Sequence, residues 1–509
     1  MTILLSTLNA RFTHTSLGLR YLYANMKQYQ AQTDIVEFTI QQNVADILEQ
    51  IINKQPQIIG FAVYIWNILE TTRLIKEIKA LRPEIIIIIG GPEVSFEYEQ
   101  TEIYKLSDYL ISGWGDISFY ELCHNILNKK PILNKAINGI QPNLDQITMP
   151  YDYYTDEDIK NRIIYIEASR GCPFKCEFCL SSLDKTAWSF PLDAFLHEMD
   201  KLYQRGLRQF KFVDRTFNLK KEFTSRILNF FLDKIAAFPE EALFLHFELV
   251  PDYLSDELKA LILKFPHGSL QFEIGIQTLH TPTQTLISRK TDLRKAKENI
   301  SWLSTHSTVH LHVDLIAGLP AETLTDFAKG FNELWSWQPQ EIQLGILKRL
   351  KGTPIIRHTE AFGYKYSLDP PYTVLENNDM SFDTLNKMKR VAKYWDLIAN
   401  SGRFRTILPL FLADDPFDKI WHFSEWLHKR TGQTHSIALD RLFAFMFTYL
   451  TEERNESITT VQQAMQEDFM RIGTHGWPKF LGEQPIQWKQ RFQNKPKSGQ
   501  QPKRQQQHN

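Results

Sequence analysis

The stretch that decides the fold runs Cys172-Pro-Phe-Lys-Cys176-Glu-Phe-Cys179 and directly follows an apolar run at residues 163–169. It contains three of the chain's four cysteines. A loop of this length can place three thiolates around one iron–sulfur cube and leave the fourth iron without a protein ligand. A structural zinc site needs four closed ligands, and the fourth cysteine, Cys123, lies on a helix predicted well before the loop. The spacing therefore indicates an iron–sulfur cluster, with a zinc site as the alternative.

Five further apolar runs follow the cysteines, each separated from the next by a predicted helix. They lie at residues 209–213, 243–247, 271–276, 309–315 and 341–347. With the run before the cysteines they make six βα units. Successive βα units of this kind can form a barrel, and in barrels the reactive groups gather at the carboxyl ends of the strands. Polar residues close these runs, namely Asp214, Glu248, Glu273, Gln277 and Asp314, although each alone could be a solvated charge or a helix cap. A basic turn at residues 348–351 follows the sixth run, where it could meet an anionic ligand or be solvated.

The CxxxCxxC spacing after a strand resembles the radical SAM superfamily. The resemblance implies a partial (β/α)6 barrel over residues 161–370 and a 4Fe-4S cluster held by Cys172, Cys176 and Cys179. It also implies that S-adenosylmethionine (SAM) chelates the open iron and is cleaved reductively to a 5′-deoxyadenosyl radical. The family pattern assigns the cofactor-binding side chains to Phe178 near the adenine, and to Asp214, Glu273, Gln277 and Asp314 around the rest of SAM.

The first 130 residues alternate short apolar runs with amphipathic segments, which is typical of a parallel sheet covered by helices. Strands are predicted at residues 2–8, 35–39, 58–63, 85–89 and 109–112, and a helix capped by Asn43 follows the second. Five strands with four helices predict a doubly wound, flavodoxin-like sheet. Sheets of this kind bind ligands beyond the carboxyl ends of their strands.

Two glycine-containing loops lie at these strand ends, and glycine lets the backbone approach a ligand closely. They contain Gly90, Gly91, Pro92 and Glu93, and then Gly113 and Gly115. Simple tight turns are the alternative. Together with the barrel, the pattern resembles the cobalamin-binding domain found at the N-terminus of many radical SAM enzymes, which assigns these residues to cobalamin. Other cobalamin proteins use a DxHxxG motif to ligate cobalt, but Phe12 replaces the aspartate before His14, so we expect cobalt without a protein lower ligand.

The remaining segments show weaker patterns. Residues 131–160 contain three prolines and are predicted as a linker, residues 371–481 as a helical domain with a Ser381 cap, and residues 482–509 as a disordered basic tail. The formal charge of −1, from 58 Lys and Arg against 59 Asp and Glu, provides no global field for nucleic acid. No apolar run approaches the ~20 residues of a membrane span, and the N-terminus lacks a signal-peptide pattern. We expect a cytoplasmic protein.

The combined resemblance implies a cobalamin-dependent radical SAM enzyme that methylates an unactivated carbon of an unidentified substrate. Such an enzyme needs an electron donor such as flavodoxin or ferredoxin. Two alternatives stay open. One is a radical SAM oxidase, cyclase or rearranging enzyme that uses cobalamin otherwise, and the other is a cobalamin- or nucleic-acid-binding module with a structural cluster.

Overall fold

The computed structural model describes residues 2–472, 476–485 and 488, and the chain divides into two units. The first unit comprises the described residues up to 217 together with 348–356 and 367–373. The second comprises residues 218–347, 357–366 and the described residues from 374 onward.

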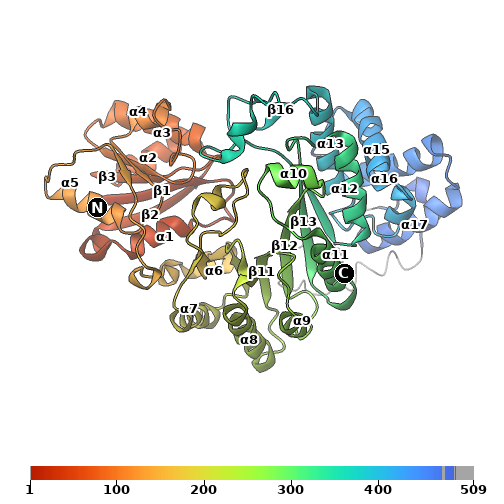
Figure 1. Ribbon diagram of the computed structural model, residues 1–509, viewed down its shortest axis with the longest axis horizontal. Coiled ribbons are helices and arrows are strands. Elements are labelled where there is room, and N and C mark those ends of the chain that lie inside the picture. The colour runs from red at the N-terminus through yellow and green to blue at the C-terminus, as the bar shows by residue number, and fades with distance from the viewer. Residues whose placement is uncertain (1, 473–475, 486–487, 489–509) are drawn as a thin grey trace. The chain divides into compact units, whose positions relative to one another are not determined.

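The first unit begins with a six-stranded parallel sheet (Figure 1). Its strands are β1 (Ile3–Asn9), β2 (Thr33–Thr39), β3 (Ile58–Ala62), β4 (Ile86–Gly90), β5 (Tyr109–Ser112) and β6 (Ala136–Asn138). The strand order is β2-β1-β3-β4-β5-β6. This order contains the 2-1-3-4-5 arrangement of flavodoxin-like sheets, so the predicted fold class of this part is confirmed.

Helices cover both faces of this sheet, because successive side chains of each buried strand point to opposite sides. Leu4 and Leu8 pack with α2 (Val44–Asn53), α3 (Ile68–Leu81) and α4 (Glu102–Leu106), whereas Ile3 and Leu5 pack with α1 (Leu17–Ala24) and α5 (Ser118–Leu127). Asn43 caps α2 as predicted, since its side chain accepts a hydrogen bond from the Ala45 amide at 2.9 Å.

Strand β6 lies inside the stretch that the sequence predicts as linker. It pairs with β5 through only three residues, Ala136 to Asn138. A strand this short at a sheet edge has no room for a recognisable alternation of polar and apolar residues, which is why the sequence pattern does not reveal it. The same stretch contains the short helix α6 (Asp156–Asn161).

The first two βα units of the barrel sequence belong to the first unit. Strand β10 (Gln209–Phe212) pairs in parallel with β7 (Ile164–Ile166). Helix α7 (Leu192–Gln204) connects them and buries Phe195 and Met199. Strands β8 (Ser169–Arg170) and β9 (Trp188–Ser189) form a separate antiparallel pair just after β7.

The second unit contains the other four strands, which pair in parallel. They are β11 (Phe244–Leu249), β12 (Leu270–Gln277), β13 (His310–Ala317) and β14 (Glu341–Ile346). Helices α8 (Lys221–Ala237), α9 (Asp256–Ile262), α10 (Thr281–Leu286), α11 (Leu293–His306) and α12 (Leu324–Ser336) lie between them in sequence. All six predicted strands are therefore present and alternate with helices, as the predicted fold class requires.

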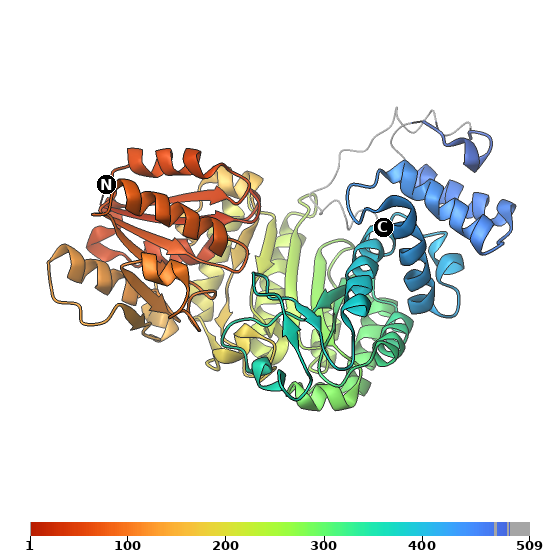
Figure 2. The same ribbon diagram turned by 90° about the horizontal axis from the view of Figure 1, so that it is seen from above.

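The rest of the described chain is mainly helical, as predicted. A small hairpin of β15 (Lys365–Tyr366) and β16 (Val374–Glu376) precedes α13 (Phe382–Ile398), α14 (Leu408–Leu412), α15 (Pro416–Thr431), α16 (Leu439–Thr448) and α17 (Ile458–Ile472), the blue helices of Figure 2. Aromatic rings join them to α12: Phe331 meets Trp395 edge-on with ring centres 4.8 Å apart. Of the predicted tail, residues 486–487 and 489–509 lie outside the described residues. No described helix combines the length and apolar character needed to cross a membrane.

Candidate functional site

A cavity of about 520 Å³ lies at the carboxyl ends of β3, β4 and β5 in the first unit. Its volume falls within the roughly 300–1,000 Å³ typical of small-molecule sites. The glycine-loop residues that line it are Gly90, Gly91, Pro92, Gly113 and Gly115. Glu93, which the sequence groups with them, is not part of the lining. The cavity also reaches Gly171, Ser181 and Arg215, so it extends from the sheet edge to the neighbourhood of the cysteines.

Gly91 is required by its surroundings. Its φ of +111° is a backbone conformation that other residues rarely adopt. A Cβ at this position would lie 2.5 Å from the carbonyl oxygen of Val63, a backbone atom that cannot move aside freely. The loop after β4 can therefore keep this backbone path along the cavity only if position 91 is glycine.

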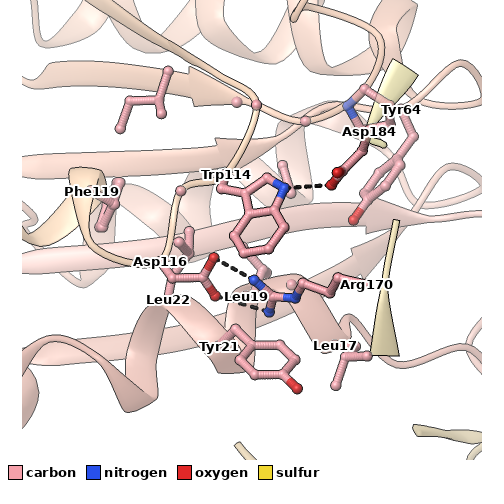
Figure 3. Close-up of a pocket in the computed structure, with 18 of the residues that line it drawn as sticks. Leu17, Leu19, Tyr21, Leu22, Tyr64, Trp114, Asp116, Phe119, Arg170 and Asp184 are labelled. Carbon is pink, nitrogen blue, oxygen red and sulfur yellow. Dashed lines mark hydrogen bonds and ion pairs between the residues drawn. The ribbon is translucent and has the colours of Figure 1, made fainter. Parts of the chain in front are cut away.

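An arginine lies in the wall of the cavity with its side chain only 12% exposed (Figure 3). Arg170 donates two hydrogen bonds to the Asp116 carboxylate, at 2.7 and 3.1 Å, and one to Glu167 at 2.9 Å. Its guanidinium lies over the rings of Tyr21 and Trp114, 4.4 and 4.9 Å from their centres. The planar, delocalised guanidinium suits this combination of paired hydrogen bonds and aromatic contact. The result is a rigid wall that joins β8 to the loop after β5.

The three cysteines lie in a loop whose two ends are joined by β8 and β9. We call residues 171–187 the cysteine loop. The Cys172 amide donates to the carbonyl of Asp184 at 2.8 Å, and the Ser182 hydroxyl lies 2.9 and 2.6 Å from the carbonyl oxygens of Cys176 and Cys179. Trp114 holds the loop from outside, because its indole N–H donates to the Asp184 carboxylate at 2.7 Å (Figure 3).

The cysteine loop fits a cluster better than a single ion. None of the three cysteines forms a disulfide bond; Cys172 and Cys176 are buried, and Cys179 is partly exposed. Among the described residues, no group of three His, Cys, Asp or Glu side chains could hold one metal ion. A closed zinc site asks for such convergence, whereas the thiolates of an iron–sulfur cluster each bind a different iron.

Asp214, predicted to contact SAM, is buried at the end of β10 and holds the backbone after β7. Its carboxylate accepts a hydrogen bond from the Ala168 amide at 3.0 Å and one from the Ser169 hydroxyl at 2.5 Å. The pKa of Asp214 is raised to about 7, because burial and the nearby charge of Glu167 outweigh the hydrogen bonds from Ser169 and Ala168, which lower it. The carboxyl is therefore close to half-protonated near neutral pH.

Asp214 makes the stability of the fold depend on pH. Because the folded state binds its proton with a pKa of about 7, above the ~3.9 of a free aspartate, the stabilisation from protonation is complete below about pH 4 and lost as pH rises towards 7. We expect Asp214→Asn to remove this dependence. Between about pH 5 and pH 8 the free energy of unfolding of the wild type should fall by roughly 2–3 kcal/mol more than that of the variant. Urea unfolding of both proteins at the two pH values measures the difference, and parallel losses would contradict the assignment.

In the second unit, the predicted acidic residues meet on one face of the sheet. Glu248, Glu273 and His312 are register partners on β11, β12 and β13, and Asp314 lies two residues further along β13. Burial raises the pKa of Asp314 well above its ordinary value, with Glu273 and Glu248 adding to the effect. Glu273 and Asp314 lie inside their strands, not at the ends as the sequence suggests, because β12 and β13 continue to Gln277 and Ala317.

The structure also places three other residues that the sequence considered as cofactor contacts, namely Gln277, Phe178 and His14. Gln277 ends β12 with a positive φ of +74°, at a break in the register with β13. Phe178 is partly exposed within the cysteine loop. His14 lies outside the cavity lining, and its Nδ1 is 2.6 Å from the hydroxyl of Tyr165.

The sequence did not single out Arg170, Tyr21 or Asp184, although all three line the cavity. Arg170 could have been noticed as a charged residue directly before Gly171-Cys172, in a stretch where Glu167 is the one other charge between residues 163 and 171. Its partner Asp116 lies 54 positions earlier, and no periodicity connects the two. Burial of an ion pair between distant segments is a property of the tertiary structure alone.

Family models match three parts of the chain. Residues 4–123 match the B12 binding domain, residues 166–334 the Radical SAM superfamily, and residues 360–508 a protein family of unknown function, DUF4080. The chain therefore joins a B12-binding domain to a radical SAM domain, as the cobalamin-binding radical SAM family does. This finding confirms the resemblance inferred from the cysteine spacing and the glycine loops.

Individual relatives are distant. "Uncharacterized methyltransferase PH0819" of Pyrococcus horikoshii is 26% identical over 237 residues, which cover 41% of this chain and 50% of the relative. The anaerobic magnesium-protoporphyrin IX monomethyl ester cyclase of Rubrivivax gelatinosus is 22% identical over 329 residues, covering 58% and 56%. This chain thus spans about half the length of these curated relatives. The solved structure of the cobalamin-dependent SAM radical enzyme OxsB, with aqua-cobalamin and SAM bound, has a TM-score of 0.62 at 12% identity, over 93% of this chain and 84% of that one, and shares its fold.

Proposed function

We propose that this chain is a cobalamin-dependent radical SAM enzyme that methylates an unactivated carbon of its substrate. The observation that carries the proposal is the shared cavity. One cavity of the first unit is lined both by the glycine loops at the edge of the B12-binding sheet and by Gly171 and Ser181 on the cysteine loop. A methyl transfer that uses both cofactors needs this proximity.

The residues present fit the two cofactors. Cys172, Cys176 and Cys179 would hold three irons of a 4Fe-4S cluster and leave the fourth for SAM, and the glycine loops would hold cobalamin. Bound there, the cluster with SAM would supply a carbon radical, and cobalamin a transferable methyl group. We assign the contacts to SAM to Phe178, Asp214, Glu273, Gln277 and Asp314, as the family pattern does.

The side chains that line the cavity suit a reaction between uncharged species. Asp116 and Glu167 both pair with Arg170, whose guanidinium lies over the rings of Tyr21 and Trp114, so this part of the wall presents aromatic faces and paired ions. Tyr64 adds a flat face, supported by the parallel ring of Trp66 with centres 4.4 Å apart. We propose that cobalt takes no lower ligand from the protein, as the broken motif around His14 implies. Water exclusion by such a wall protects reactive species from side reactions.

We infer that the enzyme works in the cytoplasm with a reducing partner. The open cluster needs a low-potential electron, which a flavodoxin or ferredoxin supplies. A reducing compartment also keeps the three cysteines as thiols until the cluster is inserted.

Anaerobic reconstitution tests the proposal. The protein is loaded with iron, sulfide and hydroxocobalamin, then given SAM and a strong reductant, and cobalt, 5′-deoxyadenosine and S-adenosylhomocysteine are measured together. Methyl transfer predicts about one cobalt per chain and both nucleosides. Absence of cobalt would remove the cobalamin role, and absence of both nucleosides would favour a binding module.

Ring formation is the second candidate, because the similarity to the Rubrivivax gelatinosus cyclase extends over 58% of this chain. A cyclase or oxidase has no use for SAM as a methyl donor. Deoxyadenosine without S-adenosylhomocysteine would therefore favour this candidate over methylation.

A further inference from the structure

The segment directly after β14 folds against the B12-binding domain. We call residues 348–356 the strap, and residues 91–97, which follow β4, the β4 loop. All of these residues belong to the first unit. The basic turn noted in the sequence is the start of the strap, and its Arg349 and Lys351 each pair with a carboxylate of the β4 loop.

Lys351 makes a buried ion pair with the β4 loop. Its Nζ lies 3.0 Å from Oε1 of Glu93, and the side chains are only 9% and 4% exposed. The Tyr372 hydroxyl donates to the same carboxylate oxygen at 2.6 Å. Lys351 also donates to the main-chain carbonyl of Glu93 at 3.4 Å. This explains why Glu93 does not line the cavity: its carboxylate is occupied on the other side of the loop.

A second set of contacts reinforces the first. Arg349 pairs with the Glu97 carboxylate, and the Gly352 amide donates to the same carboxylate at 3.0 Å. Gly352 has a φ of +80°, and a Cβ there would lie 2.4 Å from Cγ of Phe96. The strap backbone thus lies directly against the β4 loop, with no space for a side chain between them.

The β4 loop connects the strap to the cavity. Gly91 and Pro92, at its start, line the cavity. The Ser95 hydroxyl donates to the carbonyl of Gly91 at 2.9 Å and accepts a hydrogen bond from the Gly113 amide at 3.2 Å. Because Gly113 is in the other glycine loop, a shift of residues 93–97 would disturb both loops.

The far end of the strap contacts the cysteine loop. The Ile355 amide donates to the carbonyl of Glu177 at 2.9 Å. Glu177 directly follows Cys176, so this bond fixes the backbone between two of the predicted cluster ligands. Ile355 itself is fully buried, which anchors the strap at this point.

We propose that the strap is a positioning element that orders the cobalamin-binding loops and the cysteine loop together, so that occupation of one cofactor site favours the other. The inference rests on the proposed cofactor sites but adds residues of the strap, which lie outside the cavity lining. The physical basis is that one short segment is bonded to both loops and loses its fixed position if either bond set is broken. Coupling of this kind is reciprocal for binding free energies.

Lys351→Met is the sharpest test because methionine keeps an apolar stem but removes the charge that pairs with Glu93. We expect it to weaken binding of hydroxocobalamin to the cluster-free protein at least about tenfold, since a loop that is ordered only part of the time binds with reduced apparent affinity. Titration followed by absorbance and tryptophan fluorescence measures the affinity. The matched control is Lys348→Met, the same change at an exposed side chain of the same strap, and it should leave the affinity unchanged.

The coupling has its own readout in the cysteines. In the cluster-free wild type, added hydroxocobalamin should slow alkylation of Cys172, Cys176 and Cys179, as measured by peptide mass spectrometry. In Lys351→Met at saturating hydroxocobalamin this protection should be lost. Cys123, buried in α5 and with a pKa that burial raises, is the internal reference for global unfolding.

The outcomes separate this inference from the proposed function. A wild type that binds neither hydroxocobalamin nor a cluster would defeat the proposed function. A wild type that binds both, with Lys351→Met behaving like Lys348→Met, would overturn the strap inference alone. If Lys351→Met unfolds and so exposes Cys123, Tyr372→Phe takes its place in the test, because that variant removes only one hydrogen bond to Glu93. It should weaken hydroxocobalamin binding in the same direction by a smaller factor. Unchanged affinity in Tyr372→Phe would count against the strap inference.

Discussion

Cys176→Ala is expected to abolish reductive cleavage of SAM. The variant removes the middle of three predicted thiolate ligands, and two thiolates cannot hold a cube with one open iron. Formation of 5′-deoxyadenosine should fall at least about 10³-fold, as happens when one member of a catalytic unit is removed. Bound iron and sulfide per chain should fall with it, measured after anaerobic reconstitution.

Cys123→Ala is the matched control for this prediction. The same substitution is made at the one cysteine outside the cysteine loop, where the thiol is buried in α5. It should retain both the cluster and deoxyadenosine formation. Deoxyadenosine production by Cys176→Ala at the level of Cys123→Ala would show that the cluster, if present, is not held by this loop.

The sequence predicts the fold well where strands are long and buried. The runs that became β3 and β4 contain only apolar residues and glycine, because helices cover both faces of the sheet, and such runs are visible without any partner. Strands β12 and β13 can also be found from sequence, but by a different pattern, because their buried apolar residues alternate with less buried, mostly polar ones. Strand β6 shows the limit, since a three-residue edge strand depends on β5 and has almost no pattern of its own.

The candidate site is predicted only in part, and for a physical reason. Cysteine and glycine act through local spacing and backbone freedom, so the cysteine loop and Gly91 could be found from adjacent residues. Glu93 belongs to the same loop, but its role depends on Lys351, which is distant in sequence. Arg170 likewise depends on Asp116. Burial and pairing of charges are consequences of the tertiary fold, and a single sequence contains no signal for them.

Arg170→Met is expected to disorder the cavity wall. The variant leaves Asp116 and Glu167 buried, with side chains only 6% and 16% exposed, and without their shared cation. Removal of one partner from a buried ion pair typically costs about 3–5 kcal/mol, because the remaining charge is desolvated and uncompensated. Hydrogen exchange should therefore accelerate in residues 113–118 and 167–171, and hydroxocobalamin affinity should fall, because both segments line the cavity.

Two further variants show whether the effect comes from the buried charges. Arg73→Met makes the same change at an exposed position of α3 in the same unit and should leave exchange in both segments unchanged. Adding Asp116→Asn to Arg170→Met removes one of the orphaned charges, so it should restore part of the lost protection. If Arg170→Met exchanged like Arg73→Met, the ion pair would not be what holds the sheet edge to β8. If the double variant were no better than the single one, the loss would come from the unpaired Glu167 carboxylate or from the lost aromatic contacts of the guanidinium with Tyr21 and Trp114, because the added change touches neither.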